Sequence, residues 1–272
     1  MALSSSTPAL RLAAIVGLLT LYPSGAAQAQ RDFGDPSTSL RRSQQQKETA
    51  SSRPSASGKR AQVVVRDSAE AYRRTARADP RHEMVDLTEE LPGVVFDLRY
   101  TTRRNFMREA LYPPDAKPWA RREVAERLAR VQRDLAAEGL GLKIFDAYRP
   151  WSVTKRMWNS RQRLGISPRF LAPPWVGSNH NRGVALDLTL VDLATGRELE
   201  MPTGFDSFSE RAHSSYPHLP GTIKNNREKL KTVMRRHGFA TIRSEWWHFE
   251  LANAGAFAVL DLDFSDFEKP AN

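Results

Sequence analysis

The sequence of 272 residues contains no cysteine. Disulfide bonds and a lipid anchor on cysteine are therefore excluded, although the compartment stays open because exported proteins need not contain disulfides. The N-terminus also lacks a hydrophobic run of membrane-spanning length. Its apolar run LAAIVGLLTL has ten residues, whereas a helix that crosses the hydrocarbon core of a bilayer needs about 20.

Residues 1–29 have the order of a secretory signal peptide. Arg11 precedes the apolar run, a Pro-Ser-Gly break follows, and the segment AAQA places small residues before a cleavage point after Ala29. A signal peptidase reads this arrangement of a positive region, a short apolar core and small residues. The segment predicts export to the periplasm, and an uncleaved membrane anchor is the alternative.

Charge is spread unevenly along the chain. The formal net charge is +10, yet residues 30–82 alone hold twelve Lys and Arg against six Asp and Glu. This segment is rich in Ser, Gln and Arg and poor in large apolar side chains, so we predict a disordered basic linker, with a transient helix around SAEAYRRTARA. The linker is either a solvated tether or a segment attracted to an anionic cell envelope. Residues 83–272 are close to neutral, which argues against a nucleic-acid partner.

The pattern changes at residue 83, where we place the start of one catalytic domain, 83–272. Its apolar periodicity predicts strands and helices that alternate without a regular βαβ rhythm. This mixture favours an α+β domain with an antiparallel sheet flanked by helices. We expect strands at 93–100, 142–148, 183–191 and 246–251, and helices at 118–139, 151–165 and 226–239.

Two histidines and an aspartate are the candidate metal ligands. Asp187 lies on the strand face opposite the leucines of GVALDLTLV, and His180 precedes it by seven residues, with Gly183 between them. A lone histidine is more often a hydrogen-bonded structural residue, but His248 in EWWHFE completes a set of two imidazoles and one carboxylate. Such a set suits zinc with an open fourth position. Among the other histidines, His213 is the next candidate.

Glu245 and Arg149 are the candidate catalytic residues. A carboxylate beside a zinc-bound water can take its proton and pass it to a leaving amine. Residues three apart on a regular strand point to opposite faces, so Glu245 must lie in a bend or bulge before His248. The alternative is that the charges of EWWHFE are exposed on a tryptophan-rich core strand. Arg149 precedes a proline at the end of a strand, where a guanidinium can stabilise an oxyanion.

The segments DAYRP, SNHNRGVALDLTL, TGFDSF and EWWHFE, in this order, closely resemble the VanX-type D-alanyl-D-alanine dipeptidases, which are zinc peptidases of family M15, subfamily D. The resemblance runs from DLRY at residue 97 to EWWHFE and implies the α+β fold that these peptidases share with the hedgehog signalling domain. It implies one zinc ion per chain, bound by His180, Asp187 and His248, with Glu245 as the base and Arg149 as the transition-state stabiliser. By the same resemblance, Asp206 and Ser178 hold the substrate ammonium group, and Tyr100 matches a pocket tyrosine.

The sequence therefore predicts an exported zinc dipeptidase that hydrolyses D-Ala-D-Ala to two D-alanines during cell-wall turnover. One alternative is a D,D- or L,D-carboxypeptidase that trims longer peptidoglycan stem peptides. Another is a metal-stabilised peptidoglycan-binding protein without turnover, which would need neither Glu245 nor Arg149. The oligomeric state stays open.

Overall fold

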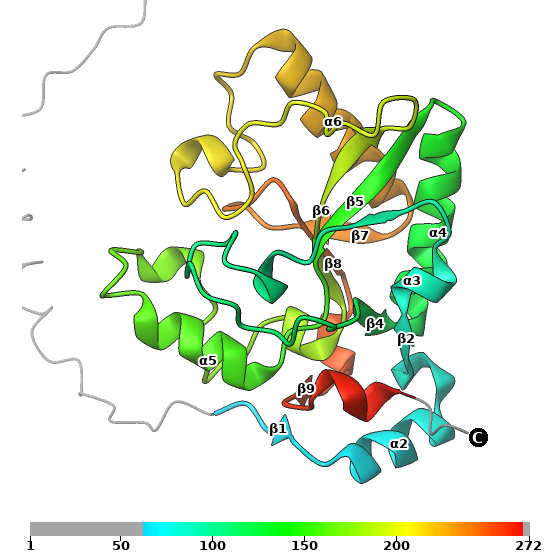
Figure 1. The fold of residues 1–272 in the computed structure, drawn as a ribbon, viewed down its shortest axis with the longest axis vertical. Coiled ribbons are helices and arrows are strands. Elements are labelled where there is room, and N and C mark those ends of the chain that lie inside the picture. Colours follow the sequence, from blue (N-terminus) through cyan, green and yellow to red (C-terminus); the bar gives the residue numbers. More distant parts are fainter. Residues whose placement is uncertain (1–61, 269–272) are drawn as a thin grey trace, which may run out of the picture. The chain divides into compact units, whose positions relative to one another are not determined.

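A five-stranded mixed sheet forms the centre of the protein in the computed structural model, which describes residues 62–268 (Figure 1). Its strand order is β3-β5-β6-β8-β7. The β3–β5 pair is parallel, and the other three pairs are antiparallel. The α+β class is confirmed. The five strands are β3 (Val95–Phe96), β5 (Leu140–Asp146), β6 (Ala185–Asp192), β8 (His248–Leu251) and β7 (Phe239–Thr241).

Two long helices, α4 (Arg122–Ala136) and α6 (Gly221–Arg236), pack with the sheet around one aliphatic core. The apolar stripe of α4, spaced three or four residues apart, is fully buried, as the helical period requires. Leu186 and Leu188 of β6 belong to the same core. Every residue of β6 except the last is buried. The central strand is therefore rigidly enclosed, and the side chains that it presents are fixed in place.

An aromatic cluster forms a second core. It includes Tyr100, Tyr148 and Phe267, and Tyr148 packs edge-on against Phe267 with ring centroids 5.0 Å apart.

The remaining elements are short strands, helices and 3-10 turns around the sheet. They are β1 (Val65–Arg66), α2 (Ala69–Ala78), β2 (Met84–Asp86), α3 (Leu87–Glu90), β4 (Trp119–Arg121), α5 (Trp151–Ser160), β9 (Val259–Leu260) and the 3-10 turns η1 (Pro80–His82), η2 (Arg99–Thr101), η3 (Pro168–Phe170), η4 (His180–Arg182), η5 (Glu210–Ala212), η6 (Ala254–Ala256) and η7 (Phe264–Phe267).

The expected helix at 118–139 is shorter at both ends. Residues 119–121 form β4, which pairs antiparallel with β2. The buried Arg121 side chain donates from Nε to the carbonyl of Arg182 at 2.8 Å, which holds this residue in the extended conformation. The expected strand at 93–100 is likewise reduced to two residues, because the chain turns into η2 at Arg99.

The prediction of a disordered linker as far as residue 82 is wrong for residues 62–82, although a helix does form where one was expected around SAEAYRRTARA, as α2. Strand β1 pairs in parallel with β9, and α2 begins at an N-cap, Ser68, whose side chain accepts from the Ala71 amide. Tyr72 is buried, and its hydroxyl accepts a hydrogen bond from the Met84 amide at 2.7 Å. Ala69 and Ala76 of α2 pack against the same aromatic cluster as Tyr72, so the helix is docked along one face. The predicted signal peptide and the rest of the predicted linker lie outside the described residues.

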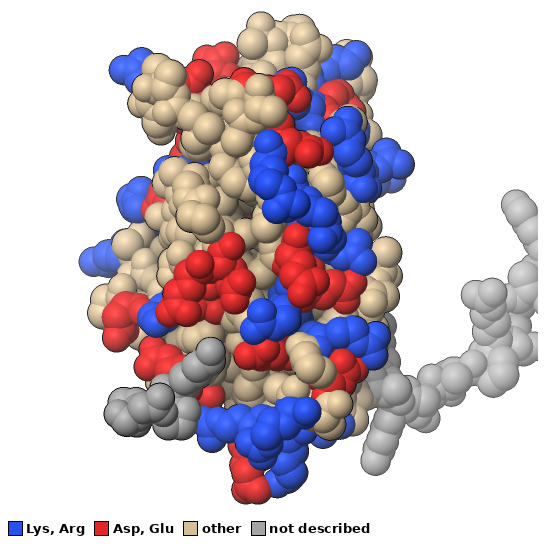
Figure 2. Space-filling view, turned by 90° about the vertical axis from the view of Figure 1, so that its right-hand side faces the viewer, with Lys and Arg blue, Asp and Glu red and all other residues tan. Residues whose placement is uncertain are grey.

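The surface of the described domain carries charges of both signs. Figure 2 shows small groups of acidic and basic side chains intermixed on one face. One ion pair of the domain is formed by Glu123 and Arg127, one turn apart on α4, with 2.6 Å between carboxylate and guanidinium. Among residues 62–268, none of the helices is long and apolar enough to cross a membrane.

Candidate active site

One cavity of about 240 Å³ is lined by all eight residues to which the sequence analysis assigned a metal-binding, catalytic or substrate-binding role. Its volume is below the roughly 300–1,000 Å³ of sites for drug-sized ligands, so it suits a smaller molecule. Four aromatic residues, Phe106, Phe170, Phe208 and Trp247, also belong to its wall. The predicted site residues that the fold brings together here are Tyr100, Arg149, Ser178, His180, Asp187, Asp206, Glu245 and His248.

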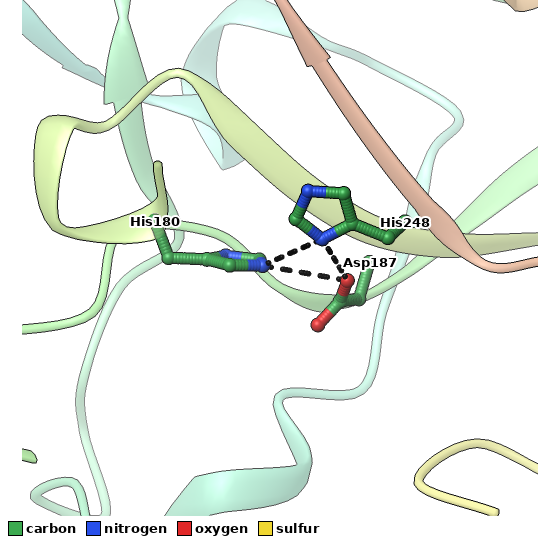
Figure 3. Close-up of side chains that lie close together, drawn as sticks. All are labelled: His180, Asp187 and His248. Carbon is green, nitrogen blue, oxygen red and sulfur yellow. Dashed lines mark hydrogen bonds and ion pairs between the residues drawn. The ribbon is translucent and has the colours of Figure 1, made fainter. Parts of the chain in front are cut away.

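The three candidate metal ligands converge from two neighbouring strands and a turn (Figure 3). Asp187 of β6 and His248 of β8 are direct partners in the antiparallel register, so their side chains share one face. Nδ1 of His248 lies 3.2 Å from Oδ1 of Asp187, and Nε2 of His180 lies 3.4 Å from the same oxygen. Gly183, at φ +70°, ends the η4 turn that carries His180, and a Cβ there would come within 2.6 Å of Met84 Sδ.

Hydrogen bonds behind the two imidazoles decide which nitrogen of each ring faces the centre. His180 Nδ1 donates to the Ala147 carbonyl at 2.8 Å, which leaves Nε2 with a free lone pair. His248 Nε2 donates to the Glu250 carboxylate at 2.8 Å, so Nδ1 faces the centre. Two nitrogen lone pairs and a carboxylate oxygen therefore meet at one point. Such an arrangement calls for a cation.

The charge of the site leads to the same conclusion. Burial disfavours a charged His248 ring, but its hydrogen bonds to Asp187 and Glu250 outweigh this and raise the pKa of His248 to about 10. A positive charge, either a proton or a metal ion, is thus strongly favoured between these carboxylates. The buried nitrogen and oxygen donors fit zinc, which binds imidazole and carboxylate and keeps an open position in catalytic sites.

Glu245 lies in the bend that the strand geometry predicts. Residues 243–247 are outside regular structure, and β8 begins only at His248. Both tryptophans of EWWHFE are buried: Trp246 donates to Thr203 Oγ1 at 3.0 Å and packs edge-on against Trp247 with ring centroids 5.5 Å apart. The reading of this stretch as a regular core strand with exposed charges is therefore wrong.

The environment of Glu245 suits a proton acceptor. Burial is the main reason that the pKa of its carboxyl is raised to about 7. The charge of His248 lowers this pKa, and the charge of Asp187 raises it further. A general base is most effective when its pKa is near the working pH. Glu245 also lines the same cavity as the three candidate ligands. It can therefore exchange protons with a group bound there.

Arg149 is held by an aspartate that the sequence analysis did not single out. Its Nε and one terminal nitrogen donate to Asp146 Oδ2 at 3.0 and 2.6 Å, and the same terminal nitrogen lies 3.7 Å from Asp187 Oδ2. Asp146 is fully buried and also accepts from the Tyr112 hydroxyl at 2.7 Å. The guanidinium is thus fixed at the wall of the cavity, beside a candidate metal ligand.

The loop that carries His180 is fastened to the loop that carries Arg149. Asn181 is completely buried, and its amide nitrogen donates to the Arg149 carbonyl and to Thr154 Oγ1, each at 2.8 Å. Its amide oxygen accepts from the Ser178 amide at 2.7 Å. Sequence reasoning missed this role, although Asn181 is the residue that follows His180 in the motif.

Tyr100, Asp206 and Ser178 complete the polar lining of the cavity. The Tyr100 hydroxyl is 3.0 Å from Asp206 Oδ1, within hydrogen-bonding distance. Burial and the nearby Asp187 charge raise the pKa of Asp206 well above its usual value, although Arg149 opposes them. Asp206 also has φ +60°, a left-handed conformation that is uncommon outside glycine. Ser178 is almost buried, and its hydroxyl accepts from the His180 amide at 3.3 Å.

The other histidines of the described region do not line this cavity. His213 ends the η5 turn, and its carbonyl lies near Arg227. His237 bonds to Asp134 at 2.9 Å, and His82 lies in η1. The alternative ligand role for His213 is therefore not supported.

The fold and the site define a class of enzyme, the metallopeptidases, in which a histidine–aspartate–histidine cluster lies beside a carboxylate base. The model of the Peptidase M15 family, described as D-ala-D-ala dipeptidase, matches residues 80–270. The chain belongs to this family.

Sequence comparison gives the same result. The chain is 37% identical over 188 residues to the D-alanyl-D-alanine dipeptidase of Escherichia coli (strain K12), a match that covers 69% of this chain and 94% of that protein. It is 33% identical over 186 residues to the D-alanyl-D-alanine dipeptidase of Enterococcus faecalis (strain ATCC 700802 / V583), covering 61% of this chain and 89% of that one. The solved structure of the LdcB LD-carboxypeptidase aligns with a TM-score of 0.38 at 17% identity, covering 68% of this chain and 76% of that chain.

Proposed function

We propose that this protein hydrolyses D-Ala-D-Ala to two molecules of D-alanine, with one zinc ion per chain. The observation that carries the proposal is the convergence of three buried acceptor atoms, from His180, Asp187 and His248, beside a glutamate whose pKa is raised to about 7. The names of the two relatives support the substrate.

Zinc bound by these three residues would polarise the scissile carbonyl and make a bound water more acidic. Glu245 accepts the proton of the attacking water and returns it to the leaving amine. Arg149, already positioned by Asp146, offers a fixed positive charge for the oxyanion that develops on the carbonyl. Each of these groups is buried or lies at the wall of one cavity, where low dielectric strengthens its effect.

The substrate ammonium group pairs with Asp206 in this proposal, with Tyr100 and Ser178 beside it. A buried carboxyl whose pKa is raised gains most from a cation that restores its charged form. A free dipeptide brings an ammonium group to this position. A longer stem peptide brings a neutral amide and leaves Asp206 without a cation, so the cavity favours a dipeptidase over a carboxypeptidase.

The test is to incubate zinc-loaded protein with D-Ala-D-Ala, L-Ala-L-Ala and a stem pentapeptide, and to quantify the products. We expect release of D-alanine from D-Ala-D-Ala and little product from the other two. Preferential release of terminal D-alanine from the pentapeptide would support the carboxypeptidase alternative. Binding of peptide without any product would support the non-catalytic one.

Export is part of the proposal and rests on the composition of residues 1–29, with recovery of D-alanine from wall turnover in the periplasm as the physiological role. The basic segment that follows, now limited to residues 30–61, would contact the anionic envelope by charge alone. Intact-mass measurement of protein recovered from the periplasm tests export: a chain that begins at Gln30 supports it, and a chain that retains Met1–Ala29 contradicts it.

A further inference from the structure

The cavity wall contains two arginines, and within the described region, residues 62–268, only Arg149 has carboxylate partners. Arg149 is hydrogen-bonded to Asp146 and lies near Asp187. Arg169 also lines the cavity, but among residues 62–268 it forms no ion pair; its guanidinium carbon lies 5.1 Å from the centre of the Phe170 ring. An arginine at the wall of a charged cavity without a carboxylate partner is available to a ligand.

The segment that carries Arg169 is held in place by aromatic side chains. The neighbouring Phe170 is buried and packs against Phe208, another residue of the cavity wall, with ring centroids 5.5 Å apart. Further along the same loop, the Pro174 carbonyl accepts a hydrogen bond from Trp151 Nε1 of α5 at 2.9 Å. The backbone at Arg169 is thus anchored through its neighbours, and the exposed Arg169 side chain lines the cavity without an acidic partner among residues 62–268.

A dipeptide has a charge at each end. Asp206 is the proposed partner of its ammonium group, and its C-terminal carboxylate needs a cationic partner. Three carboxyl groups line the cavity, those of Asp187, Asp206 and Glu245, and each repels an incoming carboxylate when ionised. Arg149 is hydrogen-bonded to Asp146 and is assigned above to the oxyanion on the scissile carbonyl, so it does not serve the C-terminal carboxylate. Resting on the function proposed above, we infer that Arg169 binds the C-terminal carboxylate of the substrate and so selects peptides with a free C-terminus.

The experiment compares D-Ala-D-Ala with D-alanyl-D-alaninamide, which lacks the carboxylate, in the wild type and in Arg169→Gln. Arg169 is exposed, and solvent weakens a charged hydrogen-bonding pair at such a site, so we expect roughly a tenfold effect on binding. We expect Arg169→Gln to raise KM for the acid by about tenfold with kcat nearly unchanged, and to leave KM for the amide as it is. For Arg169→Lys, the KM for the acid should lie between that of the wild type and that of Arg169→Gln, because lysine keeps the positive charge but loses the planar pair of donors.

The matched control is Arg163→Gln. Arg163 lies in the same loop region and is exposed, but it does not line the cavity and is 3.7 Å from Glu109. Arg163→Gln should leave the KM values for the acid and for the amide unchanged.

If Arg169→Gln keeps the wild-type preference for the acid over the amide, Arg169 does not bind the carboxylate, even if the variant has a lower kcat. If the wild type cleaves neither compound, the proposed function itself is wrong and the inference is withdrawn with it.

Discussion

The stretch EWWHFE contains two glutamates that have opposite properties in the fold. Glu245 lies in the bend before β8, where burial, together with Asp187 and against His248, raises its pKa to about 7. Glu250 lies within β8 and accepts a hydrogen bond from His248 Nε2 at 2.8 Å. Burial raises its pKa, but this hydrogen bond and the His248 charge outweigh burial and lower it. Identical side chains on either side of one histidine thus have pKa values shifted in opposite directions.

The difference follows from backbone geometry. Glu250 is two residues after His248 on the same strand, so both side chains lie on one face and can bond. Glu245 is three residues before His248 and reaches the same cavity only because the chain bends there. The lesson is that spacing within a motif assigns roles only after the local conformation is known.

The largest expected effect is on Glu245. Glu245→Gln keeps the size of the side chain and removes the proton acceptor, so turnover of D-Ala-D-Ala should fall by about 10²–10⁴-fold. Zinc content should stay near one ion per chain, since the three candidate ligands are intact. His248→Ala is the contrasting variant and should lose zinc, because two ligands rarely hold a catalytic ion. Near-normal turnover of Glu245→Gln, or loss of its zinc, would remove Glu245 from the role of base.

The pH profile sharpens the same assignment. A general base must be ionised, so kcat/KM of the wild type should fall as the pH is lowered through the pKa of Glu245, about tenfold per pH unit at the steepest. A bound dication would place this limb below about pH 7, because it favours the carboxylate. The residual activity of Glu245→Gln should lack the limb. An unchanged profile in the variant would assign the limb to another group.

Substitution of Glu250 should have a smaller effect, and this effect should be on the affinity for zinc. Glu250→Gln weakens the acceptor that orients His248, and changes of this kind typically cost about 10–100-fold in metal affinity or activity. We expect a higher dissociation constant for zinc by competition with a chelator, and recovery of most of the turnover when zinc is in excess. A turnover loss that excess zinc does not restore would mean that Glu250 acts on the substrate instead.

The smallest effect is expected for the segment before the fold. Deleting residues 30–61 from the mature chain should change kcat/KM by less than about twofold, since every cavity residue lies beyond residue 61.

A longer deletion, of residues 30–82, would also remove α2 and the buried Tyr72 and should lower stability. The single substitution Tyr72→Ala should lower the free energy of unfolding by about 3 kcal/mol, as for other buried aromatics. Equal melting temperatures for the two deletions would contradict the docking of α2.

Several features of the fold followed from local sequence. The stripe Val124, Leu128, Val131 and Leu135 predicts α4, because a 3.6-residue period places these side chains on one face. The start of α4 could not be predicted, because residues 119–121 pair with β2, more than thirty residues earlier in the chain. The docking of segment 62–82 was missed for a similar reason: its composition is polar, and it is held by contacts distant in sequence, such as the pairing of β1 with β9 and the packing of Tyr72 against Phe267.

The sequence by itself determined the five residues proposed for the metal and for catalysis, and its resemblance to the dipeptidases added Tyr100, Ser178 and Asp206; all eight line the cavity. The bend at Glu245 follows from the alternation of side chains along a strand. The tertiary structure alone decided how they are held. The Ala147 carbonyl selects the free nitrogen of His180, and Asn181 ties the turn of His180 to the carbonyl of Arg149. The physical reason is that a hydrogen bond depends on distance and direction in space, and His180 and Ala147 are 33 residues apart in the chain. Residue types fix what chemistry is possible, whereas the packing of distant segments fixes which atoms can perform it.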